Sequence, residues 1–267
     1  SAQEHQPPTL EDLDRRSTEL VEVAAARIRG CLAEKGLSEV AKEMGRSSET
    51  GHQFGLAIDE LDLGPATISQ AEQFGMLGGD VALQVVPPPL PSPESKKFTD
   101  ILASCEERDA WAREAYKVSG EITNCFNAER KAMLEVVDAE VLRALVPQVA
   151  CMSDEYPDLD EALLARGEMA DVLAGVGIGE GVWVEAATHV EEHDGVPMLY
   201  TDNVAKYVPN ANEILFARRW AMCSNQTGYH AVILASASRY KAARQAAVQD
   251  EVTQLTAEAD AVLRQRR

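Results

Sequence analysis

The sequence predicts a mainly α-helical protein, with long amphipathic helices and one inserted β-hairpin at about residues 182–200. Over most of the chain, apolar residues recur three and four positions apart, which places them on one face of a helix. The final segment, His230–Arg267, contains neither glycine nor proline. In contrast, Gly181–Tyr200 alternates apolar and polar residues around Asp194–Gly195, a dipeptide typical of a two-residue hairpin turn.

Length and composition are those of a folded protein of one large or two modest domains. The chain has 267 residues, of which 45% are hydrophobic. No apolar run approaches the roughly 18 residues that a membrane-spanning helix needs, so we expect no membrane span. The N-terminus has no signal-peptide pattern. Because the chain begins at Ser1, removal of an initiator methionine and cleavage of a longer targeting segment both stay open.

The net charge of −19, from 44 acidic against 25 basic residues, bears on the class of partner. A phosphate backbone would be repelled by this charge, and the basic pairs are too few to reverse it. We therefore expect no nucleic-acid binding. The expected partners are other protein subunits, among them basic ones.

The five cysteines are widely and unequally spaced, without a C-x-x-C motif: Cys31, Cys105, Cys125, Cys151 and Cys223. Most lie in apolar helical sequence, where a free cysteine packs as a small hydrophobic residue. The sequence thus predicts free thiols and an intracellular reducing compartment, cytoplasmic or mitochondrial, and not secretion.

Residues 1–86 are predicted to form an N-terminal helical region. Thr9 can cap a helix that runs to about Lys35, where Gly36 ends it. Shorter helices are predicted at Ser38–Met44 and Pro65–Leu77, followed by a short strand at Val81–Val86.

A proline-rich spacer, Pro87–Pro93 (PPPLPSP), separates this region from a helical body at residues 94–267. We predict a helix over Ser95–Val118, a break at Ser119–Gly120 and a second helix that ends near Pro147. The pair forms either an antiparallel hairpin or one long bent helix.

Three more helices are predicted, over Leu159–Leu173, Pro209–Cys223 and His230–Arg267. The last carries apolar residues alternately four and three positions apart: Val248, Val252, Leu255, Ala259 and Val262. This seam is typical of a coiled coil, and it could equally pack on the protein's own body.

The Asp194–Gly195 turn predicts that His193 pairs with Val196 and His189 with Tyr200. One face of the hairpin would then be apolar, with both histidines on the other face. The residues of the predicted apolar face are Val182, Val184, Ala186, Val190 and Leu199. This hairpin is interpreted as a contact surface, or as a brace between helical halves.

Two alternative interpretations assign a metal-binding or catalytic role to particular side chains. His189, Glu192 and His193 fit the H-x-x-E-H zinc pattern, which requires a helix; on a strand the two histidines would stand roughly 13 Å apart. Cys223 and His230 could form a nucleophile–base pair, with a buried thiol and a solvated histidine as the plainer interpretation.

The sequence contains neither a phosphate-binding loop nor a serine nucleophile elbow, and we expect no cofactor. The function expected is that of a non-catalytic accessory or scaffold subunit of a large multi-protein assembly. A mitochondrial respiratory or ATP-synthase-type complex is slightly preferred as host. The alternatives are a virion structural protein and a metal-dependent hydrolase that uses the H-x-x-E-H residues.

Overall fold

The computed structural model of the chain describes residues 6–47, 63–77, 83–84, 90–91, 95–166, 169–184, 187–201 and 205–265. It is mainly helical, with short antiparallel strands, which confirms the predicted fold class and the inserted hairpin. None of the helices in these ranges is long and apolar enough to span a membrane.

The N-terminal helices form where the sequence predicts them. Helix α1 spans Leu10–Glu34 and α2 spans Ser38–Ser47. The Thr9 hydroxyl accepts a hydrogen bond from the Asp12 amide, and the Asp12 carboxylate accepts one from the Thr9 amide. This reciprocal capping box satisfies amides that would otherwise be unpaired at the start of α1.

The next predicted elements are described only in part. Helix α3 spans Ile68–Phe74 and is continued by the 3₁₀ turn η2 at Gly75–Leu77. Two short strands follow, β1 at Leu83–Gln84 and β2 at Leu90–Pro91. The rest of the predicted strand and of the proline-rich spacer lies outside the described residues, and a domain division there stays a prediction.

The predicted break at Ser119–Gly120 is wrong, because the chain breaks earlier, at Asp109. Helix α4 spans Lys96–Arg108, and α5 then runs without interruption over Ala110–Met152. Asp109 accepts a hydrogen bond from the Ala112 amide and so caps α5.

Helix α5 continues through Gly120 and Pro147 because tertiary contacts hold it on both sides. Ser119 is hydrogen-bonded through its hydroxyl to Ser17 in α1, at 2.9 Å. Just after the proline, the buried Gln148 side chain donates a hydrogen bond to the carbonyl of Trp220. Packing thereby offsets the unfavourable helix propensities of glycine and proline.

The C-terminal half of the chain contains five more helices within the described ranges. They are α6 (Glu161–Arg166), α7 (Met169–Gly175), α8 (Ala211–Thr227), α9 (Tyr229–Ala247) and α10 (Gln249–Arg264). The single long helix predicted over His230–Arg267 is therefore divided at Val248. Between the predicted helices, residues 224–227 form the last turn of α8, which is closed by Gly228 in the left-handed conformation.

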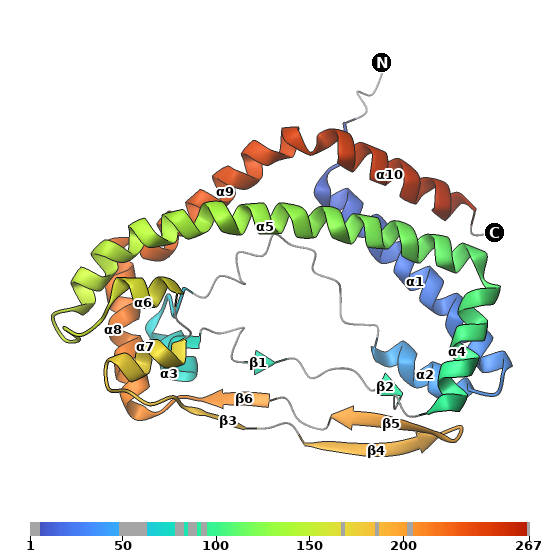
Figure 1. Cartoon of the computed structure of the whole chain (residues 1–267), viewed down its shortest axis with the longest axis horizontal. Helices are drawn as coiled ribbons and strands as arrows, with labels where there is room; N and C mark the ends of the chain where they lie inside the picture. The colour runs from blue at the N-terminus through green and yellow to red at the C-terminus, as the bar shows by residue number, and fades with distance from the viewer. Residues whose placement is uncertain are drawn as a thin grey trace.

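The buried apolar side chains form two separate cores. Helix α5 contributes to both, and it runs along most of the length of the molecule (Figure 1). The first half of α5 packs with α1, α2, α4 and α10, which we call the first body. Its second half packs with α3, α6, α7, α8 and α9, which we call the second body. The predicted seam of α10 is buried in the first core, so it lies on the protein's own body.

Each body contains one disulfide, which corrects the expectation of free thiols. Cys31 in α1 is bonded to Cys105 in α4, and Cys151 in α5 to Cys223 in α8. The partners are 74 and 72 residues apart in sequence, and only helix packing brings their Cα atoms to 5.8 and 5.7 Å. Cys125 is a buried free thiol.

Candidate functional site

Two small antiparallel sheets lie on the side of the molecule opposite α5 (Figure 1). They contain β3 (Val182–Val184), β4 (Thr188–His193), β5 (Val196–Thr201) and β6 (Ala205–Val208). The strand orders are β1-β6-β3 and β2-β5-β4, so the same three stretches of chain supply both sheets in the same order. We call this arrangement the β ribbon.

The register of the hairpin is the predicted one. His193 lies opposite Val196, Val190 opposite Leu199 and His189 opposite Tyr200. Asp194 and Gly195 both have positive φ, 54° and 74°, as the two central residues of a type I′ turn require.

The hairpin turn fastens the ribbon to the first body. The Asp194 carboxylate accepts hydrogen bonds from the backbone amides of Glu39 and Val40, at 2.9 and 3.1 Å. These amides lie in the first turn of α2, where the helix itself supplies no acceptor. Lys97 of α4 donates a hydrogen bond to the Asp194 carbonyl, at 2.9 Å. The turn thus caps a helix more than 150 residues away in sequence.

The other sheet is fastened to the second body by a buried polar network. The Tyr207 hydroxyl donates a hydrogen bond to the Glu213 carboxylate at the start of α8, and accepts one from the Gly181 amide. The second carboxylate oxygen of Glu213 accepts a hydrogen bond from the Met76 amide. Burial, followed by the hydrogen bond to Glu213, raises the pKa of Tyr207. This phenol therefore stays protonated and acts as a donor.

Gly181 permits the close approach of the strands at this junction. A Cβ atom added there would lie 2.2 Å from the Val208 carbonyl oxygen, which no side chain tolerates. The ribbon is thus held at one end to α2 and α4 and at the other to α8, as expected of a brace between helical halves.

The H-x-x-E-H residues lie in β4, so the helix required for the predicted zinc geometry does not form. His189 and His193 share a face of the strand, and Glu192 lies on the opposite face. Between the histidines, the Glu191 carboxylate accepts a hydrogen bond from each ring, at 3.0 and 3.2 Å. Hydrogen bonds from His189 and then His193 lower the pKa of Glu191.

The carboxylate between the two histidine rings is therefore Glu191 and not the predicted Glu192. His189 also stacks on Tyr200, with ring centroids 5.3 Å apart. In the part of the chain that the structure describes, no group of three or more His, Cys, Asp or Glu side chains is placed to hold a metal ion. Side chains alternate between the two faces of a strand, so a strand assignment places Glu191, and not Glu192, on the face of the two histidines.

The face of the ribbon that carries Met198 is buried, and the predicted apolar face is not. Val196 and Met198 are completely buried against the first body, and Tyr207 is buried against the second. The predicted apolar face is exposed, including Val182 at 68% and Val190 at 62%. We call this exposed surface the outer apolar face, formed by Val182, Val184, Val190, Leu199 and Val208.

The proposed Cys223–His230 pair is not a nucleophile–base pair, since Cys223 is in a disulfide. His230 instead forms a hydrogen bond with the Ser224 hydroxyl and another with the carbonyl of Gly64, the latter at 3.0 Å. Burial lowers the pKa of His230. The Trp220 indole donates to the adjacent Leu63 carbonyl, so these side chains hold a chain segment in place.

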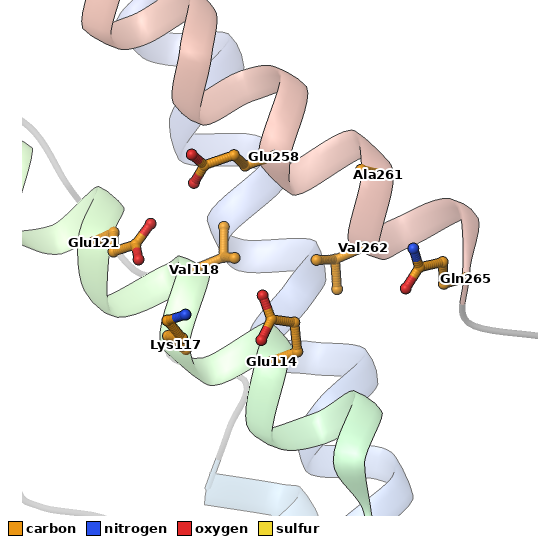
Figure 2. Close-up of a pocket in the computed structure, with 8 residues that line it drawn as sticks. All are labelled: Glu114, Lys117, Val118, Glu121, Glu258, Ala261, Val262 and Gln265. Carbon is orange, nitrogen blue, oxygen red and sulfur yellow. The ribbon is translucent and has the colours of Figure 1, made fainter.

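A groove of about 420 Å³ lies between α5 and α10 in the first body. Figure 2 shows carboxylates from both helices directed into it. Its lining residues are Glu114, Lys117, Val118, Glu121, Glu258, Ala261, Val262 and Gln265. The hydrogen bond with Glu258 raises the pKa of Glu121, because the contact requires a proton on one of the carboxyl groups. The lining contains no cysteine, serine or histidine that could act as a nucleophile or a base.

No protein-family model matches the chain, and neither a curated protein nor a solved structure matches it.

Proposed function

We propose that this protein is a non-catalytic accessory or scaffold subunit of a larger multi-protein assembly. The observation that carries the proposal is the outer apolar face of the β ribbon. Exposed apolar residues that are contiguous on a surface are typical of sites that bind other proteins. The ribbon is also fastened at both ends, so it presents this face on a fixed support.

The polar interactions of the ribbon favour a structural role over catalysis. Asp194, Tyr207 and Glu213 are engaged in hydrogen bonds that join strands to helices. Each of these side chains has its hydrogen-bonding capacity directed at the protein's own backbone or at another member of the network.

The proposed partners are protein subunits, among them basic ones, because the chain carries a charge of −19. A mitochondrial respiratory or ATP-synthase-type complex is the host that we favour, and a virus particle is the alternative. The compartment proposed from the sequence is intracellular and reducing.

The test is to isolate the protein from its source under native conditions and to measure its mass by light scattering. We expect a mass well above that of one 29.0 kDa chain, with stoichiometric partner subunits. A Val182→Lys/Val190→Lys variant should lose partners that bind the outer apolar face. The matched control is Val136→Lys, which changes an exposed valine of α5. A monomer at high concentration without any co-purifying protein would contradict the proposal.

A metal-dependent hydrolase, predicted to use His189, Glu192 and His193, is the second candidate, with Glu191 in the place of Glu192. The observation in its favour is that the two imidazoles converge on one carboxylate. Elemental analysis of the purified protein separates the candidates. Stoichiometric zinc or iron that is lost in His189→Ala/His193→Ala would support the hydrolase, and its absence would end that candidate.

A further inference from the structure

We propose that the free edge of strands β3 and β4 is a docking site for an extended, basic segment of a partner protein, which adds a strand to the β ribbon. This inference rests on the proposed function and specifies the partner's chemistry. Within the described residues, β3 and β4 each have a neighbouring strand on one side only, β6 and β5 respectively. We call their other side the free edge.

The outer face of the free edge carries exposed apolar side chains, with Glu192 as a charged residue beside them. Natural edge strands avoid pairing through charged or proline residues, bulges or a covering element. Here Val182, Val184 and Val190 are all at least half exposed on the outer face of the two edge strands. An added strand would cover these side chains with its own alternate residues while its backbone pairs with the edge.

The outward-facing side chains of β3 and β4 lie on the same face of the ribbon, so one partner segment can pair with both strands. Val184 lies opposite Lys206 and Thr188 opposite Thr201, so the pairing register changes by one residue between the sheets. Nevertheless, Val182, Val184 and Val190 all face outward. A segment with apolar residues at every second position would therefore match β3 and β4.

Charge determines which segment fits. Glu180 is exposed just before β3, and Glu192 is exposed in β4 on the same face as Val190, so both carry negative charge near the apolar side chains. A second copy of the chain would bring another net charge of −19 to this edge. Lysine or arginine side chains between the apolar residues of a partner strand would complement the glutamates.

The experiment measures binding of labelled peptides to the full-length protein by fluorescence anisotropy. The probe is an eight-residue peptide of alternating lysine and valine. One control peptide replaces lysine with glutamate. Another replaces valine with proline, which keeps the charge but removes backbone donors and prevents strand pairing. We expect the lysine–valine peptide to bind at least tenfold more tightly than either control, and its affinity to fall with added salt.

Variants locate the binding site. Val190→Lys and Glu192→Lys should each weaken binding of the lysine–valine peptide at least fivefold. The matched controls are Val136→Lys and Glu135→Lys, which make the same changes at exposed positions of α5 and should leave binding unchanged. Thermal melts followed by circular dichroism verify that all four variants are folded.

Several results would overturn the inference. They are equal binding of the proline peptide or the acidic peptide, unchanged binding to Val190→Lys, and a wild-type dimer that Val190→Lys dissociates. If the native partners still co-purify with Val190→Lys, the docking site is elsewhere and the proposed function survives. If the wild-type protein co-purifies with nothing, the proposed function itself fails.

Discussion

Asp194 in the hairpin turn lies 3.1 Å from the Val40 amide of α2, a hydrogen bond that joins residues 154 positions apart. The same carboxylate oxygen accepts a hydrogen bond from the Glu39 amide. Helix capping is usually local, by a residue that directly precedes the helix. Here the cap of α2 comes from the β ribbon, so the folding of the hairpin and of the first body are coupled.

Asp194→Ala should lower the free energy of unfolding by about 1–2 kcal/mol, the usual effect of removing a helix cap. The positive φ of residue 194 adds to the loss, because alanine disfavours that conformation. Asp194→Asn should retain most of the stability, since asparagine tolerates positive φ and keeps an acceptor oxygen. Urea unfolding compares the three proteins, and equal midpoints for all of them would contradict the capping role.

Tyr207→Phe should lower the free energy of unfolding by about 2–3 kcal/mol. The substitution leaves the buried Glu213 carboxylate and the Gly181 amide without their partner. Tyr116→Phe is the control, because that ring is 40% exposed. Thermal melts should separate the two variants clearly, and a Tyr207→Phe protein as stable as Tyr116→Phe would show that the network does not hold the ribbon.

Met198→Ala and Leu199→Ala test which face of the hairpin is buried. Met198 is completely buried against the first body and Leu199 is 43% exposed. We expect a loss of about 2–4 kcal/mol for Met198→Ala and less than about 1 kcal/mol for Leu199→Ala. Chemical denaturation of this adjacent pair measures the difference, and an equal or larger loss for Leu199→Ala would contradict the burial of the Met198 face.

Reduction of the disulfides should destabilise both bodies, by roughly 2–4 kcal/mol for each bond. Differential scanning calorimetry with and without reductant measures the change. Removal of one disulfide at a time should reproduce part of this loss of stability, in the double variants Cys31→Ser/Cys105→Ser and Cys151→Ser/Cys223→Ser. Cys125→Ser is the control, since its protein should retain the full response to reductant.

The oxidation state in the native protein also tests the proposed compartment. Alkylation of the protein at the moment of cell lysis, followed by mass spectrometry, counts the free thiols. One free thiol would indicate an oxidising environment, and five would agree with the reducing compartment expected from the sequence.

The Glu121–Glu258 contact should make the first body less stable as pH rises. The raised pKa of Glu121 means that the folded state holds this proton more tightly than the unfolded state. The stabilisation is complete below the usual carboxyl pKa and is lost as pH rises through the raised value.

Glu258→Gln should therefore raise the melting temperature at pH 7 and flatten its pH dependence between pH 4 and 7. We expect a change of about 0.5 kcal/mol or less at pH 7, because water screens this contact. Glu107→Gln, at an exposed position of α4, serves as the control. Identical pH profiles for the wild type and Glu258→Gln would contradict the shared proton.

The sequence by itself determined the local features of the chain. Helical periodicity placed most helices, Thr9 marked the start of α1, and Asp194–Gly195 set the register of the hairpin. These features depend on residues close together in sequence, where spacing and turn chemistry are sufficient.

Only the tertiary structure decided which helices are continuous and which face of the ribbon is buried. Helix α5 passes through Gly120 because Ser17 and the first core stabilise the helix there. Alternation on a strand defines two faces but does not say which one meets the helices, so Met198 became buried and Val190 exposed. The disulfides, the Asp194 cap and the hydrogen bond from Met76 to Glu213 likewise join distant elements. Their partners are set by packing, for which spacing along the chain gives no signal.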